Sequence, residues 1–257
     1  MEYALLIFTI LVGTILTFFS GFGLGTLLLP VFCLFFPIDV AVGATGIVHG
    51  MNSIFKFLFV YKNIHFPTFL RFSIPAIIFA VIGGITLSAI SELPIAWSYM
   101  FFNKTIDVSY IQLIIGCIML FFAWIELSPK LNQLKIQQKW LPLGGVLSGF
   151  FGGISGHQGA LRAAFLTKAG LTKEQFIATS NASAVIIDLT RLTVYFTTIS
   201  FGQLAPHASL ILIGILVAFI GTTIGARLVK KVTLQWIQQF VGSLLIVYGL
   251  GLIFGLI

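Results

Sequence analysis

The feature that most constrains this chain is a series of apolar runs, each long enough to cross a lipid bilayer. A run of about 18 or more apolar residues indicates a membrane-spanning helix, and six such runs lie at residues 40–61, 72–90, 106–124, 176–199, 208–226 and 234–257. Two longer runs, interrupted by glycines, occupy residues 3–38 and 141–166. Only 8% of the residues are charged, against about 25% in soluble domains. Because the runs lack the alternation of membrane barrels, we expect an all-α polytopic membrane protein.

The second of the longer runs contains the most unusual stretch of the chain. Residues 144–168 read GGVLSGFFGGISGHQGALRAAFLTK, in which His157, Gln158 and Arg162 bring polar groups into a glycine-rich apolar sequence. Glycine allows tight turns and the close approach of backbones. We interpret the stretch as a helix, a break with a polar tip, and a second helix. Residues 18–30, FFSGFGLGTLLLP, have the same character in the first run.

The two halves of the chain have the same order of segments. Each half has a glycine-interrupted run followed by three apolar spans, and a shift of 135 positions aligns Ser20 with Ser155, Gly21 with Gly156 and Lys56 with Arg191. A polar segment at residues 128–139 lies between the halves. We therefore predict an N-terminal repeat at residues 1–127, a cytoplasmic connector at 128–139 and a C-terminal repeat at 140–257.

The distribution of basic residues predicts how the chain crosses the membrane. If each interrupted run crosses once, the basic loop residues divide almost evenly between the two sides. If each run instead enters and returns, as a re-entrant hairpin or as two short spans, one side has only Lys104. The other side then has Lys62, Arg71, Lys130, Lys135, Lys139, Lys168, Lys173, Arg227, Lys230 and Lys231.

Basic residues concentrate on the cytoplasmic side of membrane proteins, so we choose the second arrangement. It has two hairpins and six full spans, with both termini outside the cytoplasm. Because each repeat then crosses an odd number of times, the two repeats must be inverted relative to each other. Inverted repeats with broken helices are typical of secondary transporters.

The two glycine-rich segments resemble the paired signatures of the TauE/SafE-type sulfite exporter family. The resemblance extends over nearly the whole chain, including its length, its duplicated halves and its basic connector. It implies a secondary permease of the cell (plasma or inner) membrane whose substrate is sulfite, an organosulfonate or a similar small anion, with the signatures near the pathway. The sequence departs from the family pattern at SGHQGA, where a run of glycines is usual, and at Phe165, which aligns with Pro30.

Polar residues inside the span at residues 40–61 form one candidate half of a site. Inserting a charged side chain into the hydrocarbon core costs about 2.5 to 3.5 kcal/mol on insertion scales. The presence of Lys56 within an apolar span therefore requires an explanation. At helical spacing, Lys56 shares a face with His49, Asn52 and Ser53. Either this polar face binds substrate, or Lys56 extends along the helix to the cytoplasmic surface.

The span at residues 176–199 contains the matching half. Asn181, Asp188, Arg191 and Tyr195 lie near one face of the expected helix, and Asp188 and Arg191 are close enough to pair. One interpretation is a structural ion pair. The other is that Arg191 faces the pathway and presents its planar fork to the anion, while Asp188, with His49, orients the cations or accepts a coupling proton.

The two glycine-rich tips complete the candidate substrate site. A break near Ser155, Gly156 and His157 would leave free backbone N–H groups at the start of the next helix, where anions bind favourably. Gln158 and Arg162 add polar and charged groups, and Ser20, Gly21 and Gly23 supply the opposing tip. Alternatively, Arg162 contacts a phospholipid headgroup, and His157 is either a structural histidine or a proton carrier.

Other kinds of chemistry find little support in the sequence. It lacks histidine pairs with metal-site spacing, CxxC motifs and phosphate loops, so we expect no metal and no cofactor. The net charge of +7 is explained by membrane orientation, and we expect no nucleic-acid partner. The expected partners are a small anionic substrate and the lipid bilayer, and the sequence leaves open whether the chain forms a homo-oligomer.

The leading hypothesis is a secondary transporter that exports a small sulfur-containing anion by alternating access. One alternative is a permease for another small solute, in which the basic residues are structural. A membrane-embedded enzyme using His157 and Asp188 is disfavoured, because no nucleophile with an adjacent base is recognisable.

Overall fold

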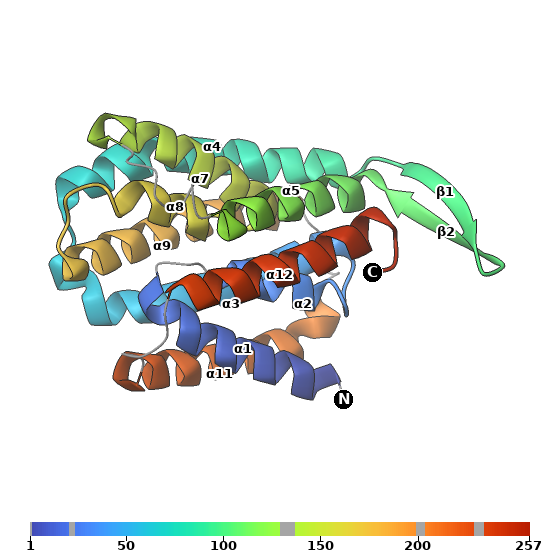
Figure 1. The fold of residues 1–257 in the computed structure, drawn as a ribbon, viewed down its shortest axis with the longest axis horizontal. Helices are drawn as coiled ribbons and strands as arrows, with labels where there is room; N and C mark the ends of the chain where they lie inside the picture. Colours follow the sequence, from blue (N-terminus) through green and yellow to red (C-terminus); the bar gives the residue numbers. More distant parts are fainter. Residues whose placement is uncertain (1, 21–23, 129–136, 199–203, 229–233) are drawn as a thin grey trace.

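The computed structural model describes residues 2–20, 24–128, 137–198, 204–228 and 234–257. Long helices lie side by side, and a two-stranded hairpin extends from one end of the bundle (Figure 1). The first half contains α1 (Glu2–Ser20), α2 (Gly25–Phe32), α3 (Ile38–Val60), η1 (Tyr61–Asn63), α4 (Phe66–Ser91), β1 (Ile95–Phe101), β2 (Lys104–Ser109) and α5 (Tyr110–Leu127). The second half contains η2 (Gln138–Trp140), α7 (Leu141–Ser155), α8 (Gly159–Leu166), α9 (Lys173–Thr198), η3 (Ala205–His207), α11 (Ala208–Leu228) and α12 (Leu234–Ile253).

Among the described residues, three segments are long and apolar enough to cross a membrane by length and composition, and they lie at Phe66–Ser91, Tyr110–Leu127 and Ala205–Arg227. The helices α3 and α9 have 23 and 26 residues, enough to cross a core of about 30 Å. They fall outside this group because buried polar residues lower their hydropathy. The structure is therefore that of a mostly helical membrane protein, in agreement with the sequence.

The order of elements repeats in the two halves. The helices α1, α2, α3, α4 and α5 correspond in order to α7, α8, α9, α11 and α12. The shift of 135 positions places Ser20, the end of α1, on Ser155, the end of α7, and Ile38, the start of α3, on Lys173, the start of α9. The repeat boundaries predicted at residues 127 and 140 fall after α5 and before α7.

Contacts between helices follow the same correspondence. The helix α4 packs on α7, and its counterpart α11 packs on α1, the counterpart of α7. The pairs α3–α9 and α5–α12 each bring a helix against its own counterpart. Such pairing is what a two-fold axis between the halves requires, and the inverted repeat stays a prediction with which these contacts agree.

Both termini lie at the end of the bundle from which the hairpin extends, and the η1 turn, cyan in Figure 1, lies at the opposite end. The topology predicted from the sequence also places Lys104 on the side of the termini and Lys62 on the opposite side. Which of the two ends faces the cytoplasm stays a prediction.

The hairpin corrects one prediction. A helix was expected from residue 106, but residues 104–109 form β2, and α5 begins at Tyr110. Ser109 and Gln112 form a capping box at that helix start. The strands are joined by Phe102 and Asn103, both with positive φ, in the two-residue turn typical of hairpins. The mostly helical protein thus contains one short pair of strands, because alternating β-branched and aromatic residues around this turn favour strand pairing.

Glycines on α7 determine how closely that helix approaches α4. Gly145, Gly149 and Gly153 recur at every fourth position, and a Cβ atom at each would collide with a backbone carbonyl of α4, at Phe72, Ala76 and Ala80 respectively. Small residues at this spacing allow helices to pack backbone to backbone in membranes. The hairpin α7–α8 is held in place by this contact.

We predict that Gly149→Ala lowers the stability of the protein, because the new methyl group meets the carbonyl of Ala76 and overpacking costs about 1 to 3 kcal/mol. Gly43→Ala is the matched control, since a Cβ there makes only ordinary contacts, at 3.7 Å, with Leu204. Thermal unfolding in detergent measures both variants. Equal melting temperatures for the two would contradict the close contact between α4 and α7.

Candidate functional site

The break in the second glycine-rich stretch lies at Gly156–Gln158. Gly156 has a φ of 78° and caps α7 in the left-handed conformation, which glycine adopts without strain. Its N–H donates to the carbonyl of Gly152 at 3.0 Å. A Cβ on Gly156 would lie 2.7 Å from Nη1 of Arg191. Glycine is therefore required here both for the turn and for the approach of Arg191.

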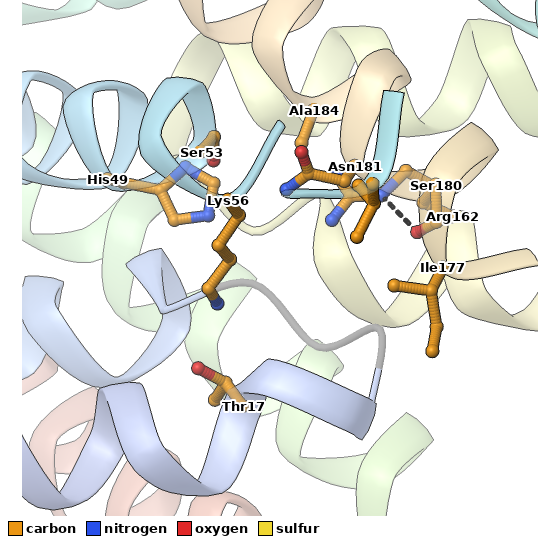
Figure 2. Close-up of a pocket in the computed structure, with 10 residues that line it drawn as sticks. Thr17, His49, Ser53, Lys56, Arg162, Ile177, Ser180, Asn181 and Ala184 are labelled. Atoms are coloured by element: carbon orange, nitrogen blue, oxygen red, sulfur yellow. Dashed lines mark hydrogen bonds between the residues drawn. The ribbon is translucent and has the colours of Figure 1, made fainter. Parts of the chain in front are cut away.

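A pocket lies beside this tip, between the ends of α1, α3, α8 and α9 (Figure 2). It has an empty volume of about 460 Å³, including its part open to solvent. Its wall is formed by Thr17, His49, Ser53, Lys56, Val60, Arg162, Ile177, Ser180, Asn181 and Ala184. Most of these side chains are polar, and the two cations come from different halves of the chain.

Lys56 and Arg162 are both buried at the pocket. Lys56 is 9% exposed, and its amine points toward Thr17 on α1 (Figure 2). Arg162 is 3% exposed; its Nε donates to Ser180 Oγ at 3.0 Å and its Nη1 to Gln158 Oε1 at 2.9 Å. Both side chains are therefore enclosed by protein at the pocket, which favours a role in the site over extension to the membrane surface or to a lipid headgroup.

Asp188 on α9 connects the pocket to the tip. One oxygen lies 2.5 Å from Nδ1 of His49, and the other accepts hydrogen bonds from Nε2 of Gln158 at 2.8 Å and from Nε of Arg191 at 3.0 Å. All four side chains are buried. The predicted pairing of Asp188 with Arg191 is therefore present, and Asp188 also orients a histidine that lines the pocket.

Formal charges around the pocket do not balance in the part of the chain that the structure describes. Three buried cations, Lys56, Arg162 and Arg191, accompany one carboxylate in the ion pairs, that of Asp188. Positive charges in a low-dielectric interior repel one another. The site therefore favours an anionic ligand.

The remaining predicted residues lie outside the pocket wall. Asn52 accepts a hydrogen bond from Thr222 of α11 at 2.6 Å. His157 stacks on Phe122 of α5, with ring centroids 5.3 Å apart, and its Nδ1 lies 3.0 Å from Ser155 Oγ. Arg191 donates to the carbonyl of Gly152 at 3.3 Å, so it lies behind the pocket.

The first tip can be described only in part. Ser20 is the last residue of α1, while its side chain, Gly21 and Gly23 lie outside the described residues. A Cβ on Gly25, at the start of α2, would lie 3.2 Å from the carbonyl oxygen of Gly156 and 3.6 Å from His49. The start of α2 therefore meets the second tip beside the pocket.

Two residues of the pocket wall, Thr17 and Ser180, were not predicted from the sequence. Ser180 lies on the same face of α9 as Asp188 and Arg191, at spacings of eight and eleven residues, so the helical periodicity could have found it. Thr17 lies one turn before Ser20, but no charged residue on α1 draws attention to that face.

Comparison with known protein families matches residues 5–252 to the family described as "Sulfite exporter TauE/SafE". The chain belongs to the TauE/SafE family. Its members are membrane transporters, as the sequence resemblance implied. Comparisons with curated proteins and with solved structures found no match.

We predict that Asp188→Asn lowers the stability of this TauE/SafE protein. Removing the carboxylate leaves Arg191 without its ion-pair partner, and the loss of one member of a buried pair costs about 3 to 5 kcal/mol. Glu174→Gln is the control, because Glu174 is an exposed carboxylate at the start of the same helix. Thermal unfolding in detergent should show a large decrease for Asp188→Asn alone, and equal effects would contradict the central position of Asp188.

Proposed function

We propose that the protein is a secondary transporter that exports a small sulfur-containing anion, such as sulfite or an organosulfonate, by alternating access. The observation that carries this proposal is the pocket walled by Lys56 on α3 and Arg162 on α8. The two cations belong to opposite halves of the chain, so motion of one half against the other changes the site. Membership of the TauE/SafE family supports transport of this class of anion.

The lining residues suit a small oxyanion. Lys56 supplies an ammonium group, and the hydroxyl groups of Thr17, Ser53 and Ser180 line the same wall. Sulfite and sulfonates present three oxygen atoms that accept hydrogen bonds from such donors. A bound anion also reduces the electrostatic repulsion among the cations at the pocket.

The position of the pocket supports a carrier open toward one end. Val60, the last residue of α3, and Ile177, near the start of α9, are part of its wall, so it lies toward the η1 end. Beyond the pocket, the hydroxyl of Tyr195 donates to the carbonyl of Gly153, and His157 packs on Phe122. If the η1 end faces the cytoplasm, the structure corresponds to the inward-open state.

Export of an anion does not require a further energy source. An inside-negative potential contributes about 2.3 kcal/mol per charge per 100 mV in the outward direction, which is sufficient for uniport. A coupled proton is the alternative, and its carriers would be His49 and Asp188, which are in contact at the pocket. Membrane-embedded catalysis is not favoured, because the described partners of this pair, Gln158 and Arg191, are not nucleophiles.

We predict that Lys56→Gln and Arg162→Gln each reduce sulfite flux in reconstituted vesicles by at least about tenfold, because each removes a charge-assisted contact to the anion. Radiolabelled sulfite is measured at alkaline pH, where it is a dianion that crosses lipid slowly. Lys62→Gln, an exposed cation at η1, is the control and should retain full flux. Normal sulfite flux in both pocket variants would show that Lys56 and Arg162 do not bind the anion.

A permease for another solute is the second candidate, in which the cations are structural. The two functions differ in their competitors. For an anion carrier, sulfite uptake should be inhibited by sulfoacetate and unaffected by dimethyl sulfone, a neutral compound of similar shape. Inhibition by the neutral compound alone would favour the second candidate.

A further inference from the structure

The polar faces of α3 and α9 continue past the pocket, toward the end of the bundle where the termini lie. Thr45 lies one helical turn from His49 on the same face of α3, on the side away from Lys56. Arg191 lies one turn beyond Asp188 on α9. Both side chains are fully buried, and neither forms part of the pocket wall.

Contacts between the two helices bring Thr45 and Arg191 to the same level. A Cβ on Gly50 would lie 3.3 Å from Cβ of Asp188, and one on Gly46 would lie 3.6 Å from Cζ of Arg191. As residue numbers fall along α3, those of the contacting residues rise along α9, so the helices are antiparallel. Thr45, adjacent to Gly46, therefore lies across from the turn of α9 that contains Arg191.

Each helix carries a hydroxyl and a cation eleven positions apart, Thr45 and Lys56 on α3, and Ser180 and Arg191 on α9. Because the helices are antiparallel, the hydroxyl of each is placed at the level of the cation of the other. Lys56 and Ser180 meet at the pocket. Thr45 and Arg191 form the corresponding combination on the far side of Asp188.

Thr45 on α3 and His157 after the tip each carry a polar atom that lacks an explanation within the fold. Thr45 Oγ1 and His157 Nε2 are buried and have no hydrogen-bond partner in the part of the chain that the structure describes. Such atoms are rare, because a buried polar atom loses its bonds to water. His157 directly follows Gly156, against whose backbone Nη1 of Arg191 is packed.

We propose that Arg191, Thr45 and His157 form a second anion site, the counterpart of the pocket on the other side of the carrier. The site is occluded in this structure and takes the same small sulfur oxyanion when the protein opens toward the end with the termini. Asp188 lies between the two sites, in contact with His49 at the first and Arg191 at the second. This inference rests on the proposed anion transport.

Cysteine labelling from each side of the membrane tests the second site. Cys33→Ala and Cys117→Ser provide a background without native thiols, into which Thr45→Cys, Ser180→Cys or Ala44→Cys is introduced. The reagent is a membrane-impermeant anionic methanethiosulfonate, applied to vesicles of either orientation. Ala44 is the matched control, because it is fully buried next to Thr45 but off the polar face.

We expect Ser180→Cys to react only from the η1 side and Thr45→Cys only from the side of the termini. Methanesulfonate, which does not react with thiols, should slow both reactions about tenfold, and neutral dimethyl sulfone should not. Ala44→Cys should react from neither side. Labelling of Thr45→Cys from the η1 side, or its failure to react from the other, overturns the second site. Equal rates with and without methanesulfonate also overturn it.

Flux in the same vesicles separates this inference from the proposed function. If the thiol-free background carries neither sulfite nor methanesulfonate, anion transport itself is wrong. If it carries either anion but Thr45→Cys does not react, only the second site is wrong.

A second variant makes the test independent of cysteine chemistry. Thr45→Val keeps the shape of the side chain and removes its hydroxyl, so we expect the rate of sulfite export to fall by about three- to tenfold. The sulfite concentration on the η1 side that gives half-maximal transport should stay unchanged. Unchanged export would overturn the assignment of Thr45.

Discussion

The carboxylate of Asp188 is the interaction on which the centre of this protein depends. It is buried and contacts groups from three helices, His49 on α3, Gln158 at the start of α8 and Arg191 on its own helix. In an apolar surrounding, each of these groups would be costly without a partner. One carboxylate therefore joins the broken hairpin to both central helices, beside a pocket whose wall contains Lys56 and Arg162.

Close helix packing supports this centre. The hairpin α7–α8 presents a polar tip in a membrane, which is possible only where protein surrounds it. Glycines at every fourth position of α7 let the hairpin approach the backbone of α4, and Gly156 turns the chain so that Arg191 fits against the tip. The function proposed for the polar groups thus depends on residues without side chains.

Much of this arrangement follows from the sequence, because its signals are local. Apolar runs identify the helices, glycines with polar neighbours identify the break at Gly156, and helical periodicity brings Lys56 onto the face of His49. The hairpin at residues 95–109 was missed because its apolar strand residues have the same hydropathy as a helix end. The separation of Arg162, in the pocket wall, from Arg191, behind it, was also beyond the sequence, since it depends on how α8 and α9 pack.

The short length of the hairpin α7–α8 determines where the membrane voltage acts. With eight residues, α8 extends roughly 12 Å, less than half of the hydrocarbon core, and the pocket beside it opens toward one end. Ions reach into such a cavity, so the potential falls mainly across the packed protein between the pocket and the other end. In the proposed transport, an anion that moves past Asp188 would cross most of the electric field in a short distance, and the voltage would drive that single step.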